Sequence, residues 1–418
     1  MKILIYEDNN FKDLYPLSML RGVYDISFGA STIKGRIEKI IAGKFEVNLH
    51  CRKNLKNYLS EVHKNKINLI TKDDYLFLNG RVIFTDVSLK NLISKKEKNT
   101  YYTFNNQIIS AFISKEKIES LENKIQRSED SVIIPEFFAE IGLKEINLKE
   151  DFKIFIIKYP WDPIQYILNG GLINDLDDFL SDNKKLAKIK DNNYSINPKK
   201  IFISKNSKIY PNVSIDATPG AVVISDNATV EPFTFIKGPA FIGKNVFVKS
   251  GTKIYGPCVI GEYSKVGGEI AESILHSFVN KQHEGFVGHS YICPFVNLGA
   301  DTVTSDLKNN YSEVRMKLNN KDVDTGMQFL GSIIGDHSKT SINTMLNTGN
   351  LIGPFANIFG GGFPPKEINS FSWNEAGKAS ISYDVDKAIE TARIVMDRRG
   401  VKMSKSYEDL VRLYYQML

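Results

Sequence analysis

No stretch of this 418-residue sequence is apolar for long enough to cross a bilayer, because no uninterrupted run of about 20 apolar residues occurs. The opening Met-Lys-Ile-Leu-Ile-Tyr is too short for the apolar core of a signal peptide, and it runs directly into Glu7 and Asp8. We therefore expect neither a membrane span nor secretion.

Cysteine is also scarce. The three cysteines, Cys51, Cys258 and Cys293, are widely spaced and form no C-x-x-C pair, which excludes a disulfide framework. Isolated thiols are typical of proteins in a reducing compartment. The sequence therefore predicts buried, unpaired cysteines and a cytoplasmic location.

The chain has only a small excess of positive charge. Lys and Arg number 54 against 48 Asp and Glu, which gives a net charge of +6. No basic block interleaved with aromatic residues occurs, so nucleic-acid binding is not indicated. A small anionic substrate remains compatible with this balance, and the chain length favours two domains or one domain with a repeat array.

Apolar residues recur every sixth position in the second half of the chain. The first members are Ile203, Ile209 and Ile215, and after a short insertion the series is Ile224, Val230, Ile236, Ile242, Val248, Ile254, Ile260 and Val266. Neither a helix nor an ordinary strand has this period, so it indicates a solenoid in which each short strand points one aliphatic residue inward. We predict a left-handed parallel β-helix of the hexapeptide-repeat type from about Ile201 to Phe363.

The pattern is interrupted once and then ends. Residues 305–330 are polar and break the period, so we expect a loop that leaves the solenoid. Beyond Pro364 the sequence pattern predicts helices. One helix is expected over Asp384–Arg399, and a shorter one is expected to begin at the capping pattern Ser406-x-x-Asp409. We expect these helices to cap the open end of the solenoid.

The first two hundred residues predict an α/β domain. Strands are expected at Ile3–Tyr6, Tyr75–Leu78 and Ile154–Ile157, and a helix at Thr32–Ile41. Together they favour a doubly wound, Rossmann-like sheet, and the polar, lysine-rich stretch over 181–197 is the expected linker. The expected domains are an α/β domain over 1–199, a β-helix over 200–369 and a helical tail over 370–418.

Histidines cluster where the repeat falters. Four of the six lie in the solenoid: His276, His283, His289 and His337. Each can be structural. A metal site within one chain is disfavoured because His283 and His289, six residues apart, lie on successive faces and cannot converge, so a metal would need a partner subunit. The other functional interpretation is acyl transfer, in which a histidine accepts the proton of an attacking amine beside a groove for a pantetheine arm.

The segment from His283 to Thr304, together with Ile334-Gly-Asp, resembles the acetyltransferase half of the bifunctional N-acetylglucosamine-1-phosphate uridyltransferases. These GlmU-like enzymes include archaeal sugar-1-phosphate nucleotidylyltransferase/acetyltransferases. The resemblance implies that His283 is the general base and that Asn297 contacts the sugar. It also implies that Ala300 and Gly360 line the acetyl-CoA groove and that Lys249 takes the place of an arginine that binds the sugar phosphate.

Several positions depart from the family pattern. Ala271 stands where the family has a phosphate-binding lysine, Phe286 replaces a tyrosine, and Asp306-Leu307 replace an Asn-Tyr pair. These changes argue against ordinary glucosamine 1-phosphate as the substrate, and they make Asp306 a candidate substrate contact. Over nearly its full length the chain looks more like a bacterial branch of sugar nucleotidyltransferase-like proteins.

The phosphate-binding loop of a nucleotidyltransferase is missing its glycines. In the resembling family a Gly-rich loop with an arginine follows the first strand, whereas this chain has no glycine between Tyr6 and Gly22. Arg21 is the candidate phosphate ligand, with Lys34 and Arg36 as further candidates. Arg21 can equally be a solvated surface residue.

A second departure concerns the metal. The aspartate expected after the central strand is replaced by Asn79-Gly80, which leaves Asp162 in Tyr-Pro-Trp-Asp as the candidate Mg²⁺ ligand. Asp162 can equally be a helix N-cap.

These features predict a cytoplasmic transferase of sugar-nucleotide or glycan synthesis. The resemblance implies that it acts on a sugar 1-phosphate, a nucleoside triphosphate and acetyl-CoA, that it uses Mg²⁺, and that it forms a homotrimer. The alternatives are a non-catalytic trimer that binds a sugar nucleotide, or an acetyltransferase whose first domain is degenerate.

Overall fold

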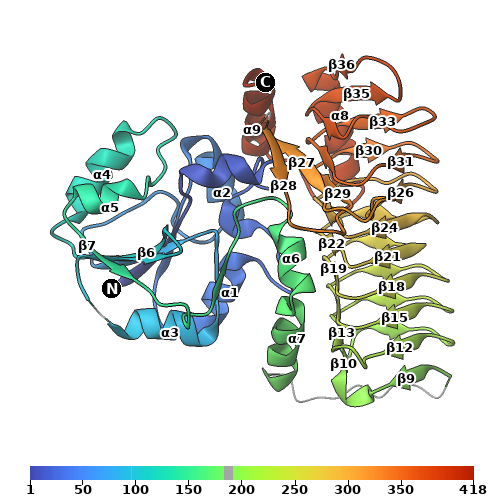
Figure 1. Ribbon diagram of the computed structural model, residues 1–418, viewed down its shortest axis with the longest axis horizontal. Helices are drawn as coiled ribbons and strands as arrows, with labels where there is room; N and C mark the ends of the chain where they lie inside the picture. The colour runs from blue at the N-terminus through green and yellow to red at the C-terminus, as the bar shows by residue number, and fades with distance from the viewer. Residues whose placement is uncertain (96, 183–191, 320) are drawn as a thin grey trace. The chain divides into compact units, whose positions relative to one another are not determined.

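The computed structural model describes residues 1–95, 97–182, 192–319 and 321–418 (Figure 1). The chain divides into an amino-terminal unit (Met1–Ile26, Ser31–Tyr159 and Lys405–Leu413) and a solenoid unit (Ser27–Ala30, Pro160–Ser404 and Tyr414–Leu418). Helices α6 (Asp162–Leu168) and α7 (Gly171–Asp182) therefore belong with the solenoid. The expected linker over 181–197 lies partly outside the described residues.

A six-stranded sheet forms the centre of the amino-terminal unit. Its order is β2-β1-β3-β6-β5-β7, with β1 (Lys2–Tyr6), β2 (Val47–His50), β3 (Tyr75–Asn79), β5 (Thr100–Phe104), β6 (Gln107–Ile113) and β7 (Lys144–Asn147). Strand β1 runs parallel to β2 and β3, but β6 runs antiparallel to β3 and β5. The α/β prediction is confirmed, whereas the sheet is mixed because β5 and β6 form a hairpin.

Helix α1 (Ile33–Ile41) begins where the sequence predicts. The Thr32 hydroxyl accepts a hydrogen bond from the Gly35 amide at 3.1 Å, which caps the first turn. The remaining elements of this unit are α2 (Lys56–Val62), α3 (Asp86–Lys95), α4 (Ile118–Arg127), α5 (Glu136–Glu140) and the antiparallel pair β4 (Val82–Phe84) and β8 (Ile154–Ile156).

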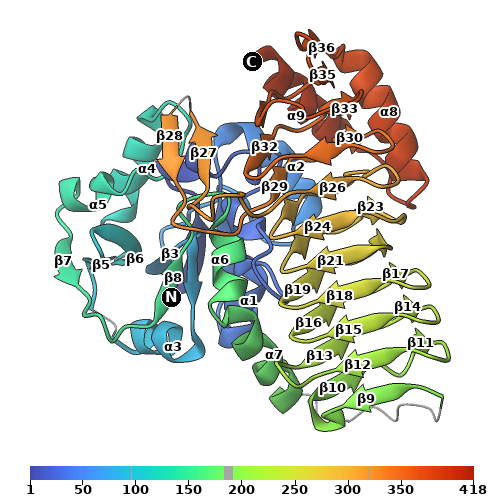
Figure 2. The ribbon, with the colours of Figure 1, turned by 45° about the vertical axis from the view of Figure 1, so that its right-hand side comes forward.

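The solenoid has three faces of parallel strands (Figures 1 and 2). The first face comprises β10 (Ile201–Ile203), β13 (Val222–Ile224), β16 (Ala240–Ile242), β19 (Cys258–Ile260), β22 (Ile274–Leu275), β25 (Tyr291–Ile292), β29 (Ser332–Ile334), β32 (Asn350–Ile352) and β34 (Glu367–Ile368). The second face comprises β11 (Lys208–Ile209), β14 (Thr229–Val230), β17 (Phe247–Val248), β20 (Lys265–Val266), β23 (Asn280–Lys281), the bridge residue Asn297, β30 (Lys339–Thr340), β33 (Asn357–Phe359) and β35 (Ser372–Glu375).

The third face comprises β9 (Tyr194–Ile196), β12 (Ser214–Asp216), β15 (Phe235–Lys237), β18 (Lys253–Tyr255), β21 (Glu269–Ala271) and β24 (Phe286–Gly288), followed by the pair β26 (Val303–Thr304) and β31 (Met345–Leu346). In register, Ile236 lies beside Ile254 and Ile254 beside Ile270, and all three side chains are fully buried. The period-six aliphatic residues therefore stack in the core, and the predicted β-helix is confirmed.

The expected excursion is also present. Between β26 and β29 the chain leaves the solenoid and forms an antiparallel pair, β27 (Arg315–Leu318) and β28 (Lys321–Asp324). The chain returns to the first face at Ser332, directly after the coil that it left.

The carboxyl-terminal helices are α8 (Val385–Asp397), capped by the Asp384 side chain, and α9 (Lys405–Gln416). The end of α8 reaches the middle of the solenoid, since Arg399 donates a hydrogen bond to Asn280 at 3.1 Å. Helix α8 therefore lies along the solenoid (Figure 2), and the expectation that it caps the open end is wrong. Its buried residues at i, i+1, i+4 and i+8 form an apolar stripe that packs sideways.

An aromatic ladder, not anticipated from the sequence, lies where the first face turns into the second. Successive coils place Tyr263, Phe278, Phe295, His337, Phe355 and Phe371 in a stack with ring centroids 4.7 to 5.0 Å apart. All six residues have positive φ, between 50° and 62°. Residues other than glycine rarely adopt this backbone conformation, and the stacking of the rings offsets its strain.

Two further expectations concern membrane spans and disulfides. Within the described ranges, no helix is long and apolar enough to cross a membrane. The three cysteines are buried and unpaired, as predicted.

We predict that Ile254→Ala lowers the free energy of unfolding of the solenoid by about 2–5 kcal/mol, because it leaves a cavity in the inward ladder. Urea unfolding followed by circular dichroism measures this loss. The control is Lys253→Ala on the same strand, whose side chain is 48% exposed and whose removal should change stability by less than about 0.5 kcal/mol. Equal losses for the two variants would contradict the inward ladder.

Candidate functional site

The corner between the second and third faces presents one residue per coil. The register aligns four inward positions in one column: Lys281, Leu298, Thr340 and Ile358. Two residues after each, at the corner, come His283, Ala300, Ile342 and Gly360. Because neighbouring coils are about 4.8 Å apart, this column extends for about 14 Å. Three expected acyl-transfer residues, His283, Ala300 and Gly360, thus lie along one corner.

His283 is exposed at a bend of the chain. Within the described part of the chain, its ring has no hydrogen-bond partner, so it is available to a ligand. Its backbone carbonyl is held from inside the solenoid, where the Lys281 ammonium donates to it at 2.6 Å and to the Glu284 carbonyl at 3.3 Å.

Lys281 occupies an inward position of the ladder, beside Val266, and is only 2% exposed. Burial lowers its pKa from 10.5 to about 8. The hydrogen bonds of the buried ammonium thus fix the backbone of the bend that contains His283. Sequence reasoning missed this role, although the loss of the six-residue period after Val266 was a signal.

His289 lies at a different corner, between the third and first faces. Its Nδ1 is 2.8 Å from an Asp306 carboxylate oxygen, and its ring stacks on Phe329 with centroids 5.1 Å apart. A Cβ at Gly288 would lie 2.3 Å from the same Asp306 oxygen, so a larger residue there would displace the Asp306 side chain. A hydrogen bond between His and a carboxylate fixes the orientation of the ring, so His289 is a held, half-buried residue.

Glu272 belongs to this second group, one coil before His289 in register. Burial raises the pKa of Glu272, and His289 opposes this shift. Asp306 was expected to contact substrate, but one of its oxygens already binds His289. Asp306 is therefore the hydrogen-bond partner of His289. His283 and His289 lie at different corners of the solenoid.

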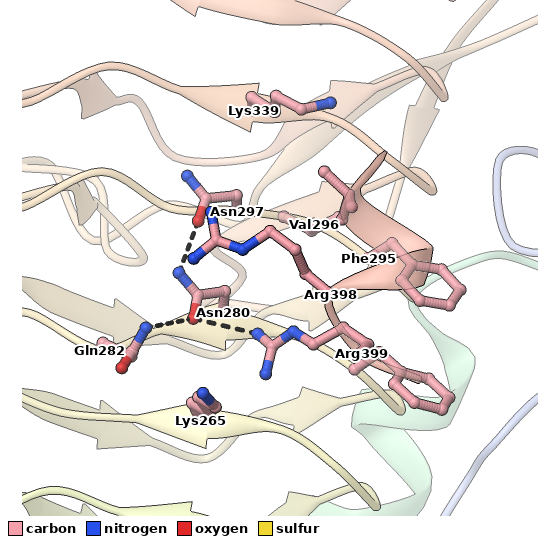
Figure 3. Close-up of a pocket in the computed structure, with 11 residues that line it drawn as sticks. Lys265, Asn280, Gln282, Phe295, Val296, Asn297, Lys339, Arg398 and Arg399 are labelled. Atoms are coloured by element: carbon pink, nitrogen blue, oxygen red, sulfur yellow. Dashed lines mark hydrogen bonds between the residues drawn. The ribbon is translucent and has the colours of Figure 1, made fainter. Parts of the chain in front are cut away.

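The other two expected solenoid residues lie apart from His283. Asn297 is on the second face, where its side-chain oxygen accepts a hydrogen bond from Asn280 at 2.5 Å. It lines a pocket of about 310 Å³ (Figure 3). Lys249 is exposed two coils before the His283 coil, which is about 10 Å along the solenoid axis.

In the amino-terminal unit a buried ion pair follows strand β1, where a glycine cradle would lie. The Glu7 carboxylate and the Arg52 guanidinium are 2.6 Å apart, and both side chains are almost fully buried. Arg52 also donates to the carbonyls of Ser18 and Met19, at 2.5 and 3.0 Å. Burial raises the pKa of Glu7, and the Arg52 charge counters it. These bonds fix the loop through its side chains.

A second buried pair joins the ends of β1 and β3. Asp8 accepts hydrogen bonds from Arg81 Nε at 2.9 Å and from the Asn79 amide at 2.8 Å. Arg81 also donates to the Ile157 carbonyl at 2.9 Å. Asn79, which replaces the expected aspartate, therefore serves as a partner of Asp8.

The three residues expected to bind phosphate form hydrogen bonds or ion pairs with other groups of the protein. Arg21 is 8% exposed and donates to the Leu17 carbonyl, so the interpretation as a solvated residue is wrong. Lys34 pairs with Glu38 at 2.7 Å, and Arg36 donates to the Phe84 carbonyl at 2.7 Å. Arg21 would have to exchange its carbonyl partner for a phosphate.

Asp162 is the first residue of α6 and is 6% exposed, while Trp161 occupies the N-cap position. The N-cap interpretation is therefore off by one residue. Among the residues that the structure describes, no three His, Cys, Asp or Glu side chains converge as a metal site. Asp162 alone does not fit a preformed Mg²⁺ cage, and Mg²⁺ would need the phosphates of a substrate as its other ligands.

We predict that Lys281 makes stability depend on pH. The folded pKa of about 8 is below the unfolded value of 10.5, so between these pH values the unfolded chain holds more protons and stability rises with pH. The contribution is at most about 1.4 kcal/mol per pH unit. Lys281→Met should remove this rise in urea unfolding between pH 8 and 10.5. Lys253→Met, which removes an exposed charge, is the control, and parallel curves for wild type and Lys281→Met would contradict the assignment.

Comparison with known proteins gives the family context. Residues 3–177 match a family model described as "Sugar nucleotidyl transferase". A bifunctional sugar-1-phosphate nucleotidylyltransferase/acetyltransferase of Sulfurisphaera tokodaii is 30% identical over 35% of this chain and 42% of its own length. A bifunctional protein GlmU of Methanococcus maripaludis is 29% identical over 68% of this chain and 70% of its own. The match thus spans less than half of the first relative.

Among solved structures, the Francisella novicida UDP-N-acetylglucosamine acyltransferase aligns over 54% of this chain and 78% of its own, at 16% identity and a TM-score of 0.36. The name of the Sulfurisphaera tokodaii relative gives two activities, nucleotidylyl transfer and acetyl transfer. Residues 3–177 thus match the sugar nucleotidyl transferase family model, and 68% of the chain is similar, at 29% identity, to a bifunctional protein GlmU.

Proposed function

We propose that the solenoid is an acetyl-CoA-dependent acyltransferase acting on an amino sugar phosphate, with His283 as the general base. The observation that carries this proposal is the corner column of His283, Ala300 and Gly360. A column of residues about 14 Å long is comparable with a pantetheine arm, so the thioester could reach His283 while the rest of the arm follows the coils.

In the proposed reaction the amine nitrogen attacks the thioester carbonyl, the new C–N bond forms and the C–S bond breaks. The imidazole of His283 accepts the proton that the amine loses and passes it to the departing sulfur, so that coenzyme A leaves as the free thiol. The ring is exposed and has no hydrogen-bond partner among the residues that the structure describes, so it is able to act as a base. Lys281 acts as a positioning residue because it fixes the carbonyls of the bend.

We further propose that the first domain binds a nucleoside triphosphate and a sugar 1-phosphate, with Arg21 as a phosphate ligand. Asp162 stays a proposed Mg²⁺ ligand, although its helix α6 groups with the solenoid unit. The family match over residues 3–177 supports this proposal. We also propose a cytoplasmic homotrimer, in line with the GlmU-like resemblance. Asn297, Asp306 and Lys249 remain proposed contacts of the sugar and its phosphate.

One observation favours the second candidate, an acetyltransferase with a degenerate first domain. Both acids that follow β1, Glu7 and Asp8, are fully buried and paired with Arg52 and Arg81. Neither is free to bind a metal or a nucleotide without breaking a buried ion pair.

We predict that His283→Ala lowers the rate of acetyl-CoA consumption by about 10²- to 10⁴-fold, because the proton acceptor is lost. The melting temperature should not change, since His283 is exposed. Thiol release with a panel of amino sugar phosphates measures the rate.

His289→Ala is the matched control for this prediction. It breaks the bond with Asp306 and the stack on Phe329, so it should lower the melting temperature and reduce the rate far less than His283→Ala. Equal losses of rate in the two variants would point to a shared structural or metal role. An unchanged rate in His283→Ala would refute the acyltransferase proposal.

We predict that Arg21→Ala abolishes pyrophosphate release from a nucleoside triphosphate and a sugar 1-phosphate, if the first domain is active. Without a glycine cradle, a side-chain cation must bind the phosphates. Lys34→Ala removes another cation of the same unit, one that already pairs with Glu38, and it should retain most of the activity. Pyrophosphate release that survives Arg21→Ala would show that the phosphates bind elsewhere, and no release from wild type with any substrate favours the degenerate first domain.

A further inference from the structure

The junction of α6 and α7 contains an asparagine followed by two glycines, Asn169, Gly170 and Gly171 (Figure 1). Asn169 follows the last residue of α6, where its backbone N–H donates to the Gln165 carbonyl at 2.9 Å, and it is exposed. Gly170 has a φ of +86°, and apart from its chain neighbours no described atom would lie within 4 Å of a Cβ built on it. The Asn169–Gly170 dipeptide is therefore open to solvent.

An exposed Asn-Gly dipeptide can react without an enzyme. The backbone nitrogen of the glycine attacks the side-chain carbonyl carbon of the asparagine, so that a new C–N bond forms while the C–N bond of the side-chain amide breaks and ammonia leaves. Water then opens the resulting succinimide ring at either carbonyl. The product is aspartate, or isoaspartate in which the main chain passes through the side chain. Glycine favours the attack because it has no Cβ to obstruct the nitrogen.

The reacting groups of this junction are available. Among the residues that the structure describes, neither the Asn169 side-chain amide nor the Gly170 N–H has a hydrogen-bond partner, so no such bond has to break before the attack. Gly170 directly precedes α7, and its carbonyl accepts a hydrogen bond from the Asn174 N–H at 3.1 Å. The positive end of a helix dipole favours negative charge, so it favours the loss of the Gly170 amide proton that the attack requires.

The second Asn-Gly dipeptide of the chain, Asn79–Gly80 at the end of β3, has the opposite surroundings. Asn79 is 1% exposed, its amide nitrogen donates to Asp8 at 2.8 Å, and its side-chain oxygen accepts from the Arg81 N–H at 3.0 Å. The Gly80 N–H donates to the Tyr6 carbonyl at 2.8 Å. The same reaction would have to break these buried bonds first, so the fold protects this dipeptide.

The packing directly after Asn169 is sensitive to the length of the main chain. Gly171 lies against the ring of Tyr166, since a Cβ built on this glycine would be 2.4 Å from a ring carbon. The Tyr166 hydroxyl donates to Asp175 of α7 at 2.9 Å, and its ring packs against Phe28 with centroids 5.1 Å apart. Isoaspartate lengthens the main chain by one methylene just before this contact, whereas aspartate adds only a charge that the start of α7 favours.

We propose that Asn169–Gly170 is a site of spontaneous succinimide formation in the folded protein, at which the asparagine is converted to aspartate and isoaspartate. The reaction releases ammonia and needs only water as a co-reactant. Isoaspartate at this position displaces Gly171 from the Tyr166 ring and so loosens the junction of α6 and α7 as the protein ages. The site rests on neither of the transfer reactions proposed above.

The test compares the two dipeptides within one sample. Full-length protein is incubated in mildly alkaline buffer and digested, and mass spectrometry follows the two peptides, while an isoaspartate-specific methyltransferase with a labelled methyl donor detects isoaspartate. We expect Asn169 to convert at least about tenfold faster than Asn79, because Asn79 reacts only after its hydrogen bonds open. In urea the two rates should become similar, since both dipeptides follow a leucine and unfolding exposes both.

Asn169→Gln is the matched variant. It keeps the exposed amide but would have to close a larger ring, so it should form no isoaspartate at this position. Asn169→Asp, measured fresh, adds the charge without lengthening the main chain and should keep the urea midpoint of fresh wild type. Aged wild type should have a lower midpoint, and aged Asn169→Gln should not.

The comparison of the two wild-type peptides depends on no variant, so it decides the proposal even if a variant misfolds. Conversion of Asn169 no faster than that of Asn79 in the folded protein would overturn the site. An undiminished isoaspartate signal in Asn169→Gln would place the reaction elsewhere in the chain. An unchanged urea midpoint in wild type that carries isoaspartate at this position would refute the loosening of the junction.

Discussion

The inward aliphatic ladder is the constraint on which the solenoid and its sites depend. Each coil buries one aliphatic side chain per face, and hydrogen bonds to the coils above and below satisfy the backbone. Because the ladder and the backbone hydrogen bonds fix the register, many outward positions can carry different side chains without disturbing the fold. Such positions fall into columns with a spacing of about 4.8 Å, so residues 17 or 42 apart in the chain, such as His283 with Ala300 and Ala300 with Ile342, become neighbours.

The exceptions to the ladder are informative. Lys281 takes an inward position and its ammonium satisfies two carbonyls at the bend of His283, which is a structural reason for a polar group inside an apolar column. His283 and His289 are six residues apart, so they lie at successive corners of one coil and have different surroundings. His283 stands exposed at one corner, whereas His289 is held at the next corner by Asp306 and Phe329.

The amino-terminal unit meets a related requirement by other means. The loop after β1 has no glycines, and buried ion pairs of Glu7 with Arg52 and of Asp8 with Arg81 hold it to the sheet. Breaking either pair would leave an uncompensated buried charge, so this loop is rigid through its side chains. The pocket that Asn297 lines shows the opposite arrangement, since its described lining has no acidic residue beside its four cations, Lys265, Lys339, Arg398 and Arg399.

The sequence by itself determined the repeat, the α/β character of the first domain and the boundaries of several elements, including α1 and β3, since these depend on local periodicity and capping. The family resemblance singled out His283, Ala300 and Gly360, and the structure places these three residues in one column. Only the tertiary structure decided the antiparallel β6, the path of α8 along the second face, the His289–Asp306 bond and the pocket of Arg398 and Arg399. These features join residues that are far apart in the chain, and no local pattern records which partner a charge or a helix face will meet.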